Sequence, residues 1–261
     1  MAPNSVHLGA VSLLITHYNR SRSLRRLLEA FADLNCSFGG IVVSDDCSKP
    51  EHLTVLQALR DEFGFMLVTT PKNGGLGHNI NKGQDAVQTP YTLYIQEDFV
   101  PKPAFIPELQ TALNLLEQDP ALDVARFYAY IPYPYMTPRQ GSFSAMHLPR
   151  WGLDYTKIYM YSDHPHLRRS SFLQKFGRYA EGLNVDKTEY RMCISFLQNK
   201  GNGLFFRDFK ALLSQENDTA EPSTFTREQW TRSQNPVIAA VRYVYRQLKY
   251  NADIQFMPRR V

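Results

Sequence analysis

Acidic side chains follow two strand-like apolar runs in the first half of the chain. The segment 96–98, Gln-Glu-Asp, comes directly after the run 91–95, and Asp45 and Asp46 end the run 40–44. A carboxylate at the end of a buried strand is unfavourable unless a cation or hydrogen-bond donors compensate its charge. Mg²⁺ and Mn²⁺ prefer oxygen ligands of this kind. Because neighbouring parallel strands bring their carboxyl ends to one crevice, the pattern predicts a nucleotide site with a divalent metal.

Two common phosphate-binding motifs are missing from the sequence. A dinucleotide fingerprint, Gly-x-Gly-x-x-Gly, would follow the first strand, but residues 16–20 read Thr-His-Tyr-Asn-Arg. The glycines at positions 74, 75 and 77 follow the third predicted strand, and position 79, where the last glycine would stand, is asparagine. The chain also has no Gly-Lys-Ser/Thr. These observations argue against an NAD-dependent enzyme of the usual type and against a P-loop NTPase.

The composition is that of a globular protein. The 261 residues are 43% hydrophobic and 21% charged, which suits one α/β domain with an attached lobe. The net charge of +4 is too small to imply nucleic-acid binding, although it suits an anionic ligand. The three cysteines, Cys36, Cys47 and Cys193, are far apart, which indicates reduced thiols. Residues 1–8 lack a basic leader region and the apolar run 11–15 is short, so we expect a cytoplasmic protein.

Apolar strands alternate with amphipathic helices along the first half. Strands are predicted at residues 11–15, 41–44, 65–69 and 91–95. Helices are predicted across residues 24–31, 53–59, 78–87 and 105–116. This alternation predicts a parallel sheet with right-handed crossovers and covered faces, so that ligands bind beyond the carboxyl ends of the strands.

The pattern changes from about Asp123. Residues 124–129 read as a strand, but residues 130–135 form a tyrosine- and proline-rich segment that cannot pair as a central strand. The tyrosines from Tyr128 to Tyr135 either cover the edge of a core, which we favour, or face a sugar ring.

A C-terminal amphipathic helix is predicted over residues 236–250. Asn235 can cap it and Pro236 suits its first turn. Its apolar stripe comprises Val237, Val241, Val244 and Leu248. The basic residues off the stripe and beyond it are Arg242, Arg246, Lys249, Arg259 and Arg260. We favour packing of this stripe against the rest of the protein, and peripheral contact with an anionic membrane is the alternative.

Four segments resemble the nucleotide-sugar-dependent glycosyltransferases of family 2, which have the GT-A fold. Segment 12–20 is similar to the opening strand and Thr-x-Tyr-Asn-Arg turn of that family, and segment 42–48 to its Val-Asp-Asp-Gly-Ser. Segment 73–83 resembles its pair of Asn-x-Gly motifs, and segment 94–101 stands where the family places Asp-x-Asp. Ser44, Cys47 and Gln96 depart from the family pattern. The order and spacing of the four segments are more specific than any one of them.

The resemblance implies an α/β GT-A fold: a Rossmann-like, mostly parallel nucleotide-binding sheet with helices on both faces, a smaller acceptor-side lobe and the C-terminal amphipathic helix. It implies that residues 1–122 form the nucleotide-sugar-binding half of the domain and residues 123–213 the acceptor-binding half. Residues 214–261 are expected to be a linker and a helical extension.

The resemblance also implies a metal ligand and a donor site. Asp98 is implied as the direct ligand of Mn²⁺ or Mg²⁺; Gln96 replaces the first acid of the usual pair, and Glu97 compensates in part. Asp45 is implied to face the base or ribose. The full set of implied donor-binding residues is Thr16, Tyr18, Asn19, Arg20, Asp45, Asp46, Asn73, Gly77, Asn81, Gln96 and Glu97. For Asp45 and Asp46 the alternative is a turn or helix cap, and for the glycines it is a purely conformational role.

Sugar transfer with inversion needs a general base on the acceptor side. The segments 166–181 and 186–201 are similar to the Arg-Arg, Gly-x-x-x-Glu and Glu-Asp pattern of the family. Glu189 best fits the catalytic acidic position, with Asp186 second and Glu181 third, although Tyr190 stands where the family has its following Asp. The alternative for Asp186 and Glu189 is a capping box of the helix that reaches Asn199.

Several basic side chains in the second half have two interpretations. His164 and His166 either reach a metal or diphosphate or serve as ordinary hydrogen-bonding groups. Arg168 and Arg169 either hold the diphosphate or lie on a solvated face.

We therefore expect an inverting, metal-dependent glycosyltransferase. It would move a sugar from a nucleotide-diphosphate sugar to a hydroxyl group of a glycan or lipid-linked acceptor, in the synthesis of a surface polysaccharide or glycoconjugate. No nucleic-acid partner is expected. A nucleotidyltransferase is one alternative, although the glycine-rich, Arg/Lys-bearing loop of that class is missing after the first strand. An inactive glycosyltransferase-like binding protein is the other, suggested by Gln96 and Tyr190.

Overall fold

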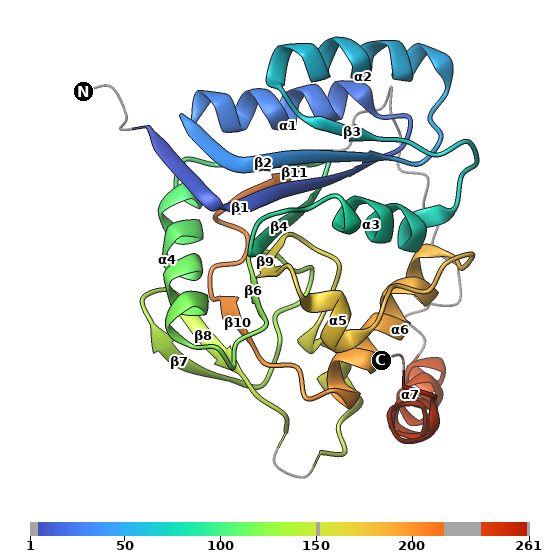
Figure 1. The fold of residues 1–261 in the computed structure, drawn as a ribbon. Coiled ribbons are helices and arrows are strands. Elements are labelled where there is room, and N and C mark those ends of the chain that lie inside the picture. The colour runs from blue at the N-terminus through green and yellow to red at the C-terminus, as the bar shows by residue number, and fades with distance from the viewer. Residues whose placement is uncertain (1–4, 150–151, 217–235, 260–261) are drawn as a thin grey trace.

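A computed structural model describes residues 5–149, 152–216 and 236–259 (Figure 1). Its helices are α1 (Ser21–Asp33), α2 (Pro50–Phe63), α3 (Gly75–Asp85), α4 (Phe105–Gln118), the 3₁₀-helix η1 (Tyr155–Met160), α5 (Phe172–Phe176), α6 (Val185–Gln198) and α7 (Pro236–Phe256). Its strands are β1 (Val6–His17), β2 (Cys36–Asp45), β3 (Met66–Val68), β4 (Tyr91–Gln96), β5 (Phe99–Pro101), β6 (Val124–Arg126), β7 (Met136–Gln140), β8 (Phe143–Met146), β9 (His166–Arg169), β10 (Gly203–Phe206) and β11 (Leu213–Gln215).

Nine of these strands form one sheet in the order β3-β2-β1-β4-β9-β6-β10-β8-β7. Strands β3, β2, β1 and β4 are parallel, and β9 joins them antiparallel to β4 and β6. The register pairs Thr16 with Gln96 and His17 with Asp45, so the carboxyl ends of β1, β2 and β4 are neighbours. The alternating elements of the first half therefore bring the two acidic clusters to one edge, as the sequence predicts.

Both faces of the sheet are covered, which explains the unbroken apolar runs in the central strands. Leu13 and Ile15 of β1 are fully buried in the layer that contains α1, α2 and α4. Leu14, which points to the opposite face, packs in the layer with α3, α5 and α6 (Figure 1). The predicted helices and strands of the first half all form.

The second half departs from the prediction at β6, which is shorter than the expected strand over 124–129. The backbone N–H of Phe127 still donates to the carbonyl oxygen of Pro165 at 3.1 Å, but proline has no N–H to return. The ladder between β6 and β9 therefore stops there. The aromatic segment that follows lies outside the sheet, and the next strand begins at Met136.

Helix α6 does not have the capping box that was the alternative role for Asp186 and Glu189. Asn184 is its N-cap residue, and the Asn184 side chain accepts a hydrogen bond from the backbone N–H of Lys187 at 2.9 Å. Asp186 therefore stands inside the first turn, and Glu189 stands one turn further along the helix.

Helix α7 packs on α6 and η1, as favoured from the sequence, but with a different face (Figure 1). The side-chain amide of Gln198 donates to the carbonyl oxygens of Ile254 and Met257 at 3.1 and 2.8 Å. The Asn251 amide donates to the carbonyl oxygen of Leu153 at 2.7 Å. Tyr250, Ile254 and Met257 also pack against the core cluster of α5 and α6, so this packing combines polar and apolar contacts.

The predicted apolar stripe of α7 does not make that contact. Val241, Val244 and Leu248 are 59%, 55% and 70% exposed. The expected cap Asn235, the side chain of Val237 and Arg260 lie outside the described residues. Within the described ranges, none of the helices has the length and apolar character needed to cross a lipid bilayer.

Helix α3 approaches the segment before α6 very closely at Gly77. A Cβ atom at this position would lie 2.2 Å from the carbonyl oxygen of Ala180 and 3.2 Å from the Thr188 side chain. Because the nearer atom belongs to the backbone, it cannot move aside without shifting the chain.

We predict that Gly77→Ala destabilises the protein by about 1–3 kcal/mol, the typical effect of overpacking. Chemical denaturation at constant protein concentration measures this difference. Gly40→Ala is the matched control, since its Cβ would meet only the Ser12 hydroxyl at 3.4 Å. Equal stability of the two variants would show that α3 does not depend on this close approach.

Candidate active site

A cavity of about 450 Å³ lies beyond the carboxyl ends of β1, β2 and β4 and reaches the first turn of α6. It therefore joins the two halves of the sheet at the edge where ligands bind in open α/β sheets. Ten of the residues predicted from the sequence line it: Thr16, Tyr18, Arg20, Asp46, Asn73, Gln96, Glu97, Asp98, Asp186 and Glu189.

One guanidinium group faces the two buried acids that follow β4. The Nη1 atom of Arg20 lies 3.3 Å from Oε1 of Glu97 and 3.5 Å from Oδ2 of Asp98. Glu97 and Asp98 are 9% and 6% exposed, so this charge compensation is only weakly screened by water. Arg20 itself follows the turn after β1, where its backbone N–H donates to Nε2 of His17 at 3.2 Å.

The side chain of Gln215 is a second partner of Asp98. Its amide nitrogen donates to Oδ2 of Asp98 at 2.9 Å, and its amide oxygen accepts from the Tyr130 hydroxyl at 2.8 Å. Gln215 reaches this place because β11 pairs with β5, which directly follows Asp98. Within the described part of the chain, Oδ1 of Asp98 is buried and has no hydrogen-bond partner.

Burial raises the pKa of Glu97 to about 8, and the negative charge of Asp98 adds to this effect. Arg20 opposes the shift without cancelling it. At neutral pH Glu97 is therefore mainly protonated.

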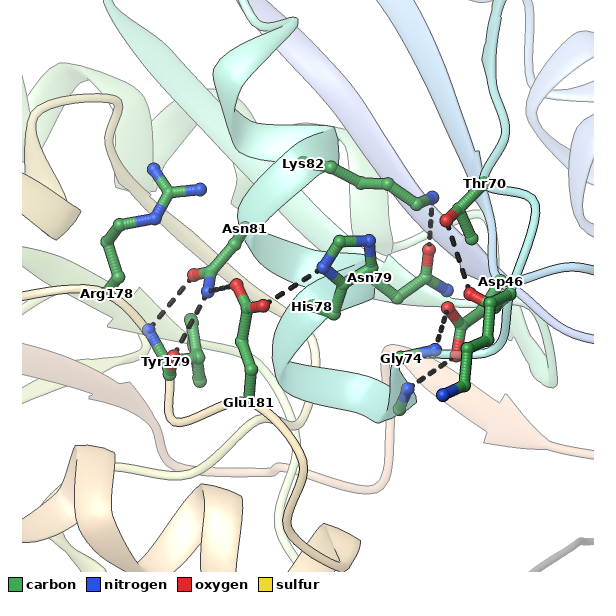
Figure 2. Close-up of polar contacts among 12 residues, drawn as sticks. Asp46, Thr70, Gly74, His78, Asn79, Asn81, Lys82, Arg178, Tyr179 and Glu181 are labelled. Atoms are coloured by element: carbon green, nitrogen blue, oxygen red, sulfur yellow. Dashed lines mark hydrogen bonds and ion pairs between the residues drawn. The ribbon is translucent and has the colours of Figure 1, made fainter.

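The Asp46 carboxylate lies at the N-terminus of α3. Its two oxygens accept hydrogen bonds from the backbone N–H groups of Gly74 and Gly75 at 2.9 and 2.8 Å, as Figure 2 shows. These N–H groups and the helix dipole stabilise its negative charge. Asp46 thus lies on the cavity wall and binds the start of α3, whereas the cap considered from the sequence was at the helix that begins at Pro50.

Asp45 points away from the cavity and is fully buried. It accepts a hydrogen bond from Nδ1 of His17 at 2.7 Å and from the backbone N–H of Ser48 at 2.9 Å. Burial alone would raise its pKa, but these hydrogen bonds outweigh burial and leave the pKa below its usual value. The structure therefore gives Asp45 the turn role that was the alternative to contact with the base or ribose.

Three other predicted donor residues hold the walls of the site without lining it. Asn19 adopts a positive φ of 54°, and its side chain accepts from the backbone N–H of Lys49 at 2.8 Å. Gly77 permits the close approach of α3 described above. Asn81 exchanges hydrogen bonds with the backbone of Tyr179, and its amide also donates to Glu181 at 2.8 Å (Figure 2).

A second cavity, of about 320 Å³, lies beside the first on the side of η1, α6 and α7. Four residues line both cavities: Tyr130, His164, Asp186 and Glu189. The carboxylate of Glu189 accepts a hydrogen bond from the backbone N–H of Asp163 at 3.1 Å. The two best candidates for the base therefore stand where the cavities meet.

Asp163 is a site residue that sequence analysis missed. It is 4% exposed, and burial together with the charge of Glu189 raises its pKa to about 8. The hydroxyls of Tyr161 and Tyr179 lie close enough to oppose this shift, but neither makes a hydrogen bond of ordinary geometry to it. One negative charge on the pair Asp163 and Glu189 is thus favoured near neutral pH.

Other candidates from the second half lie away from the first cavity. Glu181 bonds His78 at 3.1 Å on the outer side of α3 (Figure 2). His166 is fully buried. Arg168, also fully buried, donates to Gln84 at 2.8 Å, and Arg169 donates to the carbonyl oxygen of Leu122 at 2.8 Å. Neither arginine forms the solvated face that was the alternative to diphosphate binding.

The oxygen atoms near Asp98 provide some, but not all, of the ligands that a divalent cation needs. Oδ1 of Asp98 is a buried acceptor with no partner among the described residues, and Gln96 lines the same cavity. No group of three His, Cys, Asp or Glu side chains with metal-ligand geometry occurs in the described ranges. A cation such as Mg²⁺ is often held by one or two carboxylates with substrate phosphates and water supplying the rest, which matches this set.

Comparison with solved structures defines the fold. The chain is similar to S. aureus TarS 1-349 in complex with UDP-GlcNAc, with a TM-score of 0.62 and 16% identity over 94% of this chain and 73% of that one. It is also similar to the mannosyltransferase PcManGT from Pyrobaculum calidifontis in complex with GDP-Man and Mn²⁺, with a TM-score of 0.56 and 11% identity over 98% and 72% of the two chains. The predicted GT-A fold is confirmed.

The pattern of glycosyl transferase family 2 matches residues 12–177, well over half of the sequence. The chain therefore belongs to glycosyl transferase family 2. A protein of Haemophilus influenzae described as an uncharacterized glycosyltransferase is 26% identical over 114 residues. That match spans 43% of this chain and 36% of the relative. In the comparison with another structure of TarS 1-349, this chain covers 59% of the TarS chain.

The raised pKa of Glu97 predicts a pH-dependent effect on stability. Between its ordinary value of 4.5 and about 8, the folded protein holds a proton that the unfolded chain releases. Stability from this group therefore falls as pH rises through that window. The glutamine of Glu97→Gln cannot ionise, so the variant does not lose this stability as pH rises. We expect the melting temperature of the variant minus that of the wild type to increase by at least about 2 °C from pH 5 to pH 8.5.

Differential scanning calorimetry across this pH range measures the effect. Glu117→Gln, which replaces an exposed carboxylate on α4, should follow the wild type at every pH. A constant difference between Glu97→Gln and the wild type would contradict a protonated Glu97.

Proposed function

We propose that the protein is an inverting glycosyltransferase that uses a nucleotide-diphosphate sugar and a divalent cation. The observation that carries this proposal is the junction of two cavities, with buried acidic residues in the first and the carboxylates of Asp186 and Glu189 at their boundary. Membership of glycosyl transferase family 2 and the GT-A fold support it.

The charge of the first cavity supports a role for a cation. Six described residues that line it carry carboxyl groups: Asp46, Glu97, Asp98, Asp163, Asp186 and Glu189. Arg20 is the only lysine or arginine among those lining residues. Even with Glu97 and Asp163 protonated, an anionic diphosphate meets excess negative charge here, so its binding requires an additional positive charge.

Asp98, through Oδ1, and the Gln96 amide oxygen are the groups that would hold this cation. When bound, the cation would compensate the negative charge that develops on the departing diphosphate. Arg20, with its Nη1 atom 3.5 Å from Oδ2 of Asp98, orients this carboxylate. Because Arg20 already neutralises part of the acidic pair, we expect weak metal binding in the absence of nucleotide.

The donor would lie across the first cavity. Tyr18 is half-buried at the wall formed by the turn after β1, where its ring can stack on a nucleobase. Thr16 and Asp46 line the cavity near the same strand ends. This placement directs the diphosphate to Asp98 and the sugar toward α6.

Glu189 is the proposed general base. It would take the proton of the acceptor hydroxyl while that oxygen bonds to the anomeric carbon, and the bond from this carbon to the phosphate oxygen breaks with both electrons. Attack from the second cavity, opposite to the diphosphate, inverts the anomeric configuration. The backbone N–H of Asp163 orients the Glu189 carboxylate, and a protonated Asp163 leaves the negative charge on Glu189. Asp186 is the second candidate.

A glycan or lipid-linked acceptor would occupy the second cavity. Its walls include the rings of Tyr159, Tyr190 and Tyr250, and aromatic rings suit the apolar faces of sugars. This acceptor class is consistent with the synthesis of a surface polysaccharide or glycoconjugate.

Family membership disfavours the nucleotidyltransferase alternative. The structure also offers a local reason for Tyr190, one of the two departures that suggested an inactive relative. The Tyr190 hydroxyl donates to the carboxylate of Asp253 and so ties α6 to α7. This departure therefore serves the docking of α7, which is compatible with an active enzyme.

Asp98→Asn tests the cation site. We predict that a nucleoside diphosphate, among UDP, GDP and dTDP, raises the melting temperature of the wild type in the presence of MnCl₂. The variant should lose most of this shift because a neutral amide is a weaker cation ligand, and its nucleotide affinity should fall at least about tenfold. Asp61→Asn, an exposed change on α2, is the control. An unchanged manganese-dependent shift in Asp98→Asn would refute this site.

Glu189→Gln tests the base. We expect kcat to fall about 10²–10⁴-fold while binding of the nucleoside diphosphate is retained, since proton transfer contributes this much to catalysis. Asp186→Asn should have a smaller effect. Sugar transfer is measured by release of the nucleoside diphosphate, and NMR of the product gives the anomeric configuration. Retained configuration, or full activity of Glu189→Gln, would contradict the mechanism.

A further inference from the structure

Helix α7 has two chemically different faces. The inner face contacts the rest of the protein: Tyr250 lines the second cavity, the backbone N–H of Tyr155 donates to the Gln247 side chain at 2.9 Å, and Asn251 bonds the Leu153 carbonyl. This face carries most of the polar side chains of the helix.

The outer face of α7 is apolar and exposed. It consists of Val241, Val244, Tyr245, Leu248, Ala252 and Phe256, which follow the i, i+3, i+4, i+7 spacing of one helix side. The large members of this outer face are 51–75% exposed, and none of the six residues carries a charge. Figure 1 shows α7 at the edge of the molecule, outside α6.

The charges beside the outer face are mainly positive. Residues 236–259 contain four basic side chains, Arg242, Arg246, Lys249 and Arg259, and one acidic side chain, Asp253. Arg242 follows Val241 directly and so stands at one border of the outer face. The Lys249 ammonium turns to the inner side, where it pairs with Asp253 and lies 4.7 Å from the centre of the Tyr190 ring. Four basic and one acidic side chain leave residues 236–259 with a net positive charge, and an uncharged apolar face on such a helix complements the anionic headgroups and acyl region of a lipid surface.

We propose that the outer face of α7 docks the protein on an anionic membrane surface. A second copy of the chain is the less suitable occupant, because a stable protein interface takes about 20–30 residues a side, whereas this face offers six. A lipid surface needs only a narrow apolar stripe that enters the headgroup boundary, with basic side chains above it.

Docking through the outer face of α7 would also set the distance between the second cavity and the lipid surface. Tyr250 lines that cavity from the inner face of α7, and an α-helix with its side chains is about 10–12 Å thick. The second cavity would then lie about one helix diameter from the lipid surface. This favours a lipid-linked acceptor whose reacting hydroxyl stands close to the headgroups, a refinement that rests on the proposed function.

Flotation with vesicles tests the docking without any nucleotide. We expect the full-length protein to float with phosphatidylcholine vesicles that contain about 30 mol% phosphatidylglycerol and to float less with pure phosphatidylcholine. Leu248→Glu should reduce binding to the anionic vesicles at least about tenfold, since it places a charge at the centre of the apolar face. Raising the salt from about 0.1 M to about 1 M should weaken binding of the wild type.

Gln57→Glu is the matched control, because it makes the same change in net charge at an exposed position of α2. It should bind like the wild type, and circular dichroism should show that both variants fold. Equal binding of Leu248→Glu and the wild type, or no flotation of the wild type, would overturn the proposal. So would a dimer in sedimentation velocity that Leu248→Glu dissociates. Because the assay needs neither donor nor acceptor, its result is independent of the proposed sugar transfer.

Discussion

The ion pair between one guanidinium and two buried carboxyl groups at the end of β4 sets the properties of this site. Arg20 lies within 3.5 Å of both Glu97 and Asp98, and it is held there by the turn after β1. Burial and the negative charge of Asp98 outweigh this single positive charge, so Glu97 keeps its proton at neutral pH. Within the ranges that the structure describes, Oδ1 of Asp98 is buried and has no hydrogen-bond partner, and this oxygen is the basis of the proposed cation site.

The same pair connects the donor side to the acceptor side. Gln215 bonds Asp98 and Tyr130, and Tyr130 lines both cavities. On the other wall, the backbone N–H of Asp163 fixes the Glu189 carboxylate. The first connection comes from the two-stranded sheet of β5 and β11, and the second comes from the loop that precedes β9 of the nine-stranded sheet. The relative position of Asp98 and Glu189 therefore depends on segments that are far apart in the sequence.

Local patterns in the sequence were sufficient for the first half of the fold and for ten residues of the site. The alternation of strands and helices predicts where β1, β2 and β4 end and therefore where the acidic segment 96–98 lies. The choice of Asp98 within that segment came from the resemblance to the family. The alternation of strands and helices does not specify the direction of each side chain or the pairing of segments that are distant in the sequence. Asp45 and Asp46 are adjacent, and only the structure shows that Asp45 bonds His17 while Asp46 faces the cavity. Gln215 reaches Asp98 through the pairing of β11 with β5, which no local periodicity encodes. For α7, periodicity identifies an apolar stripe but does not decide whether this stripe packs against protein or faces a lipid surface.

A crystal soaked with manganese and the nucleoside diphosphate that stabilises the protein tests the central claim most directly. The account predicts an anomalous manganese peak bonded to Oδ1 of Asp98 and to the diphosphate, with Arg20 still paired with the acids after β4. A nucleotide bound with its phosphates remote from Asp98, or manganese bound to other side chains, would contradict it.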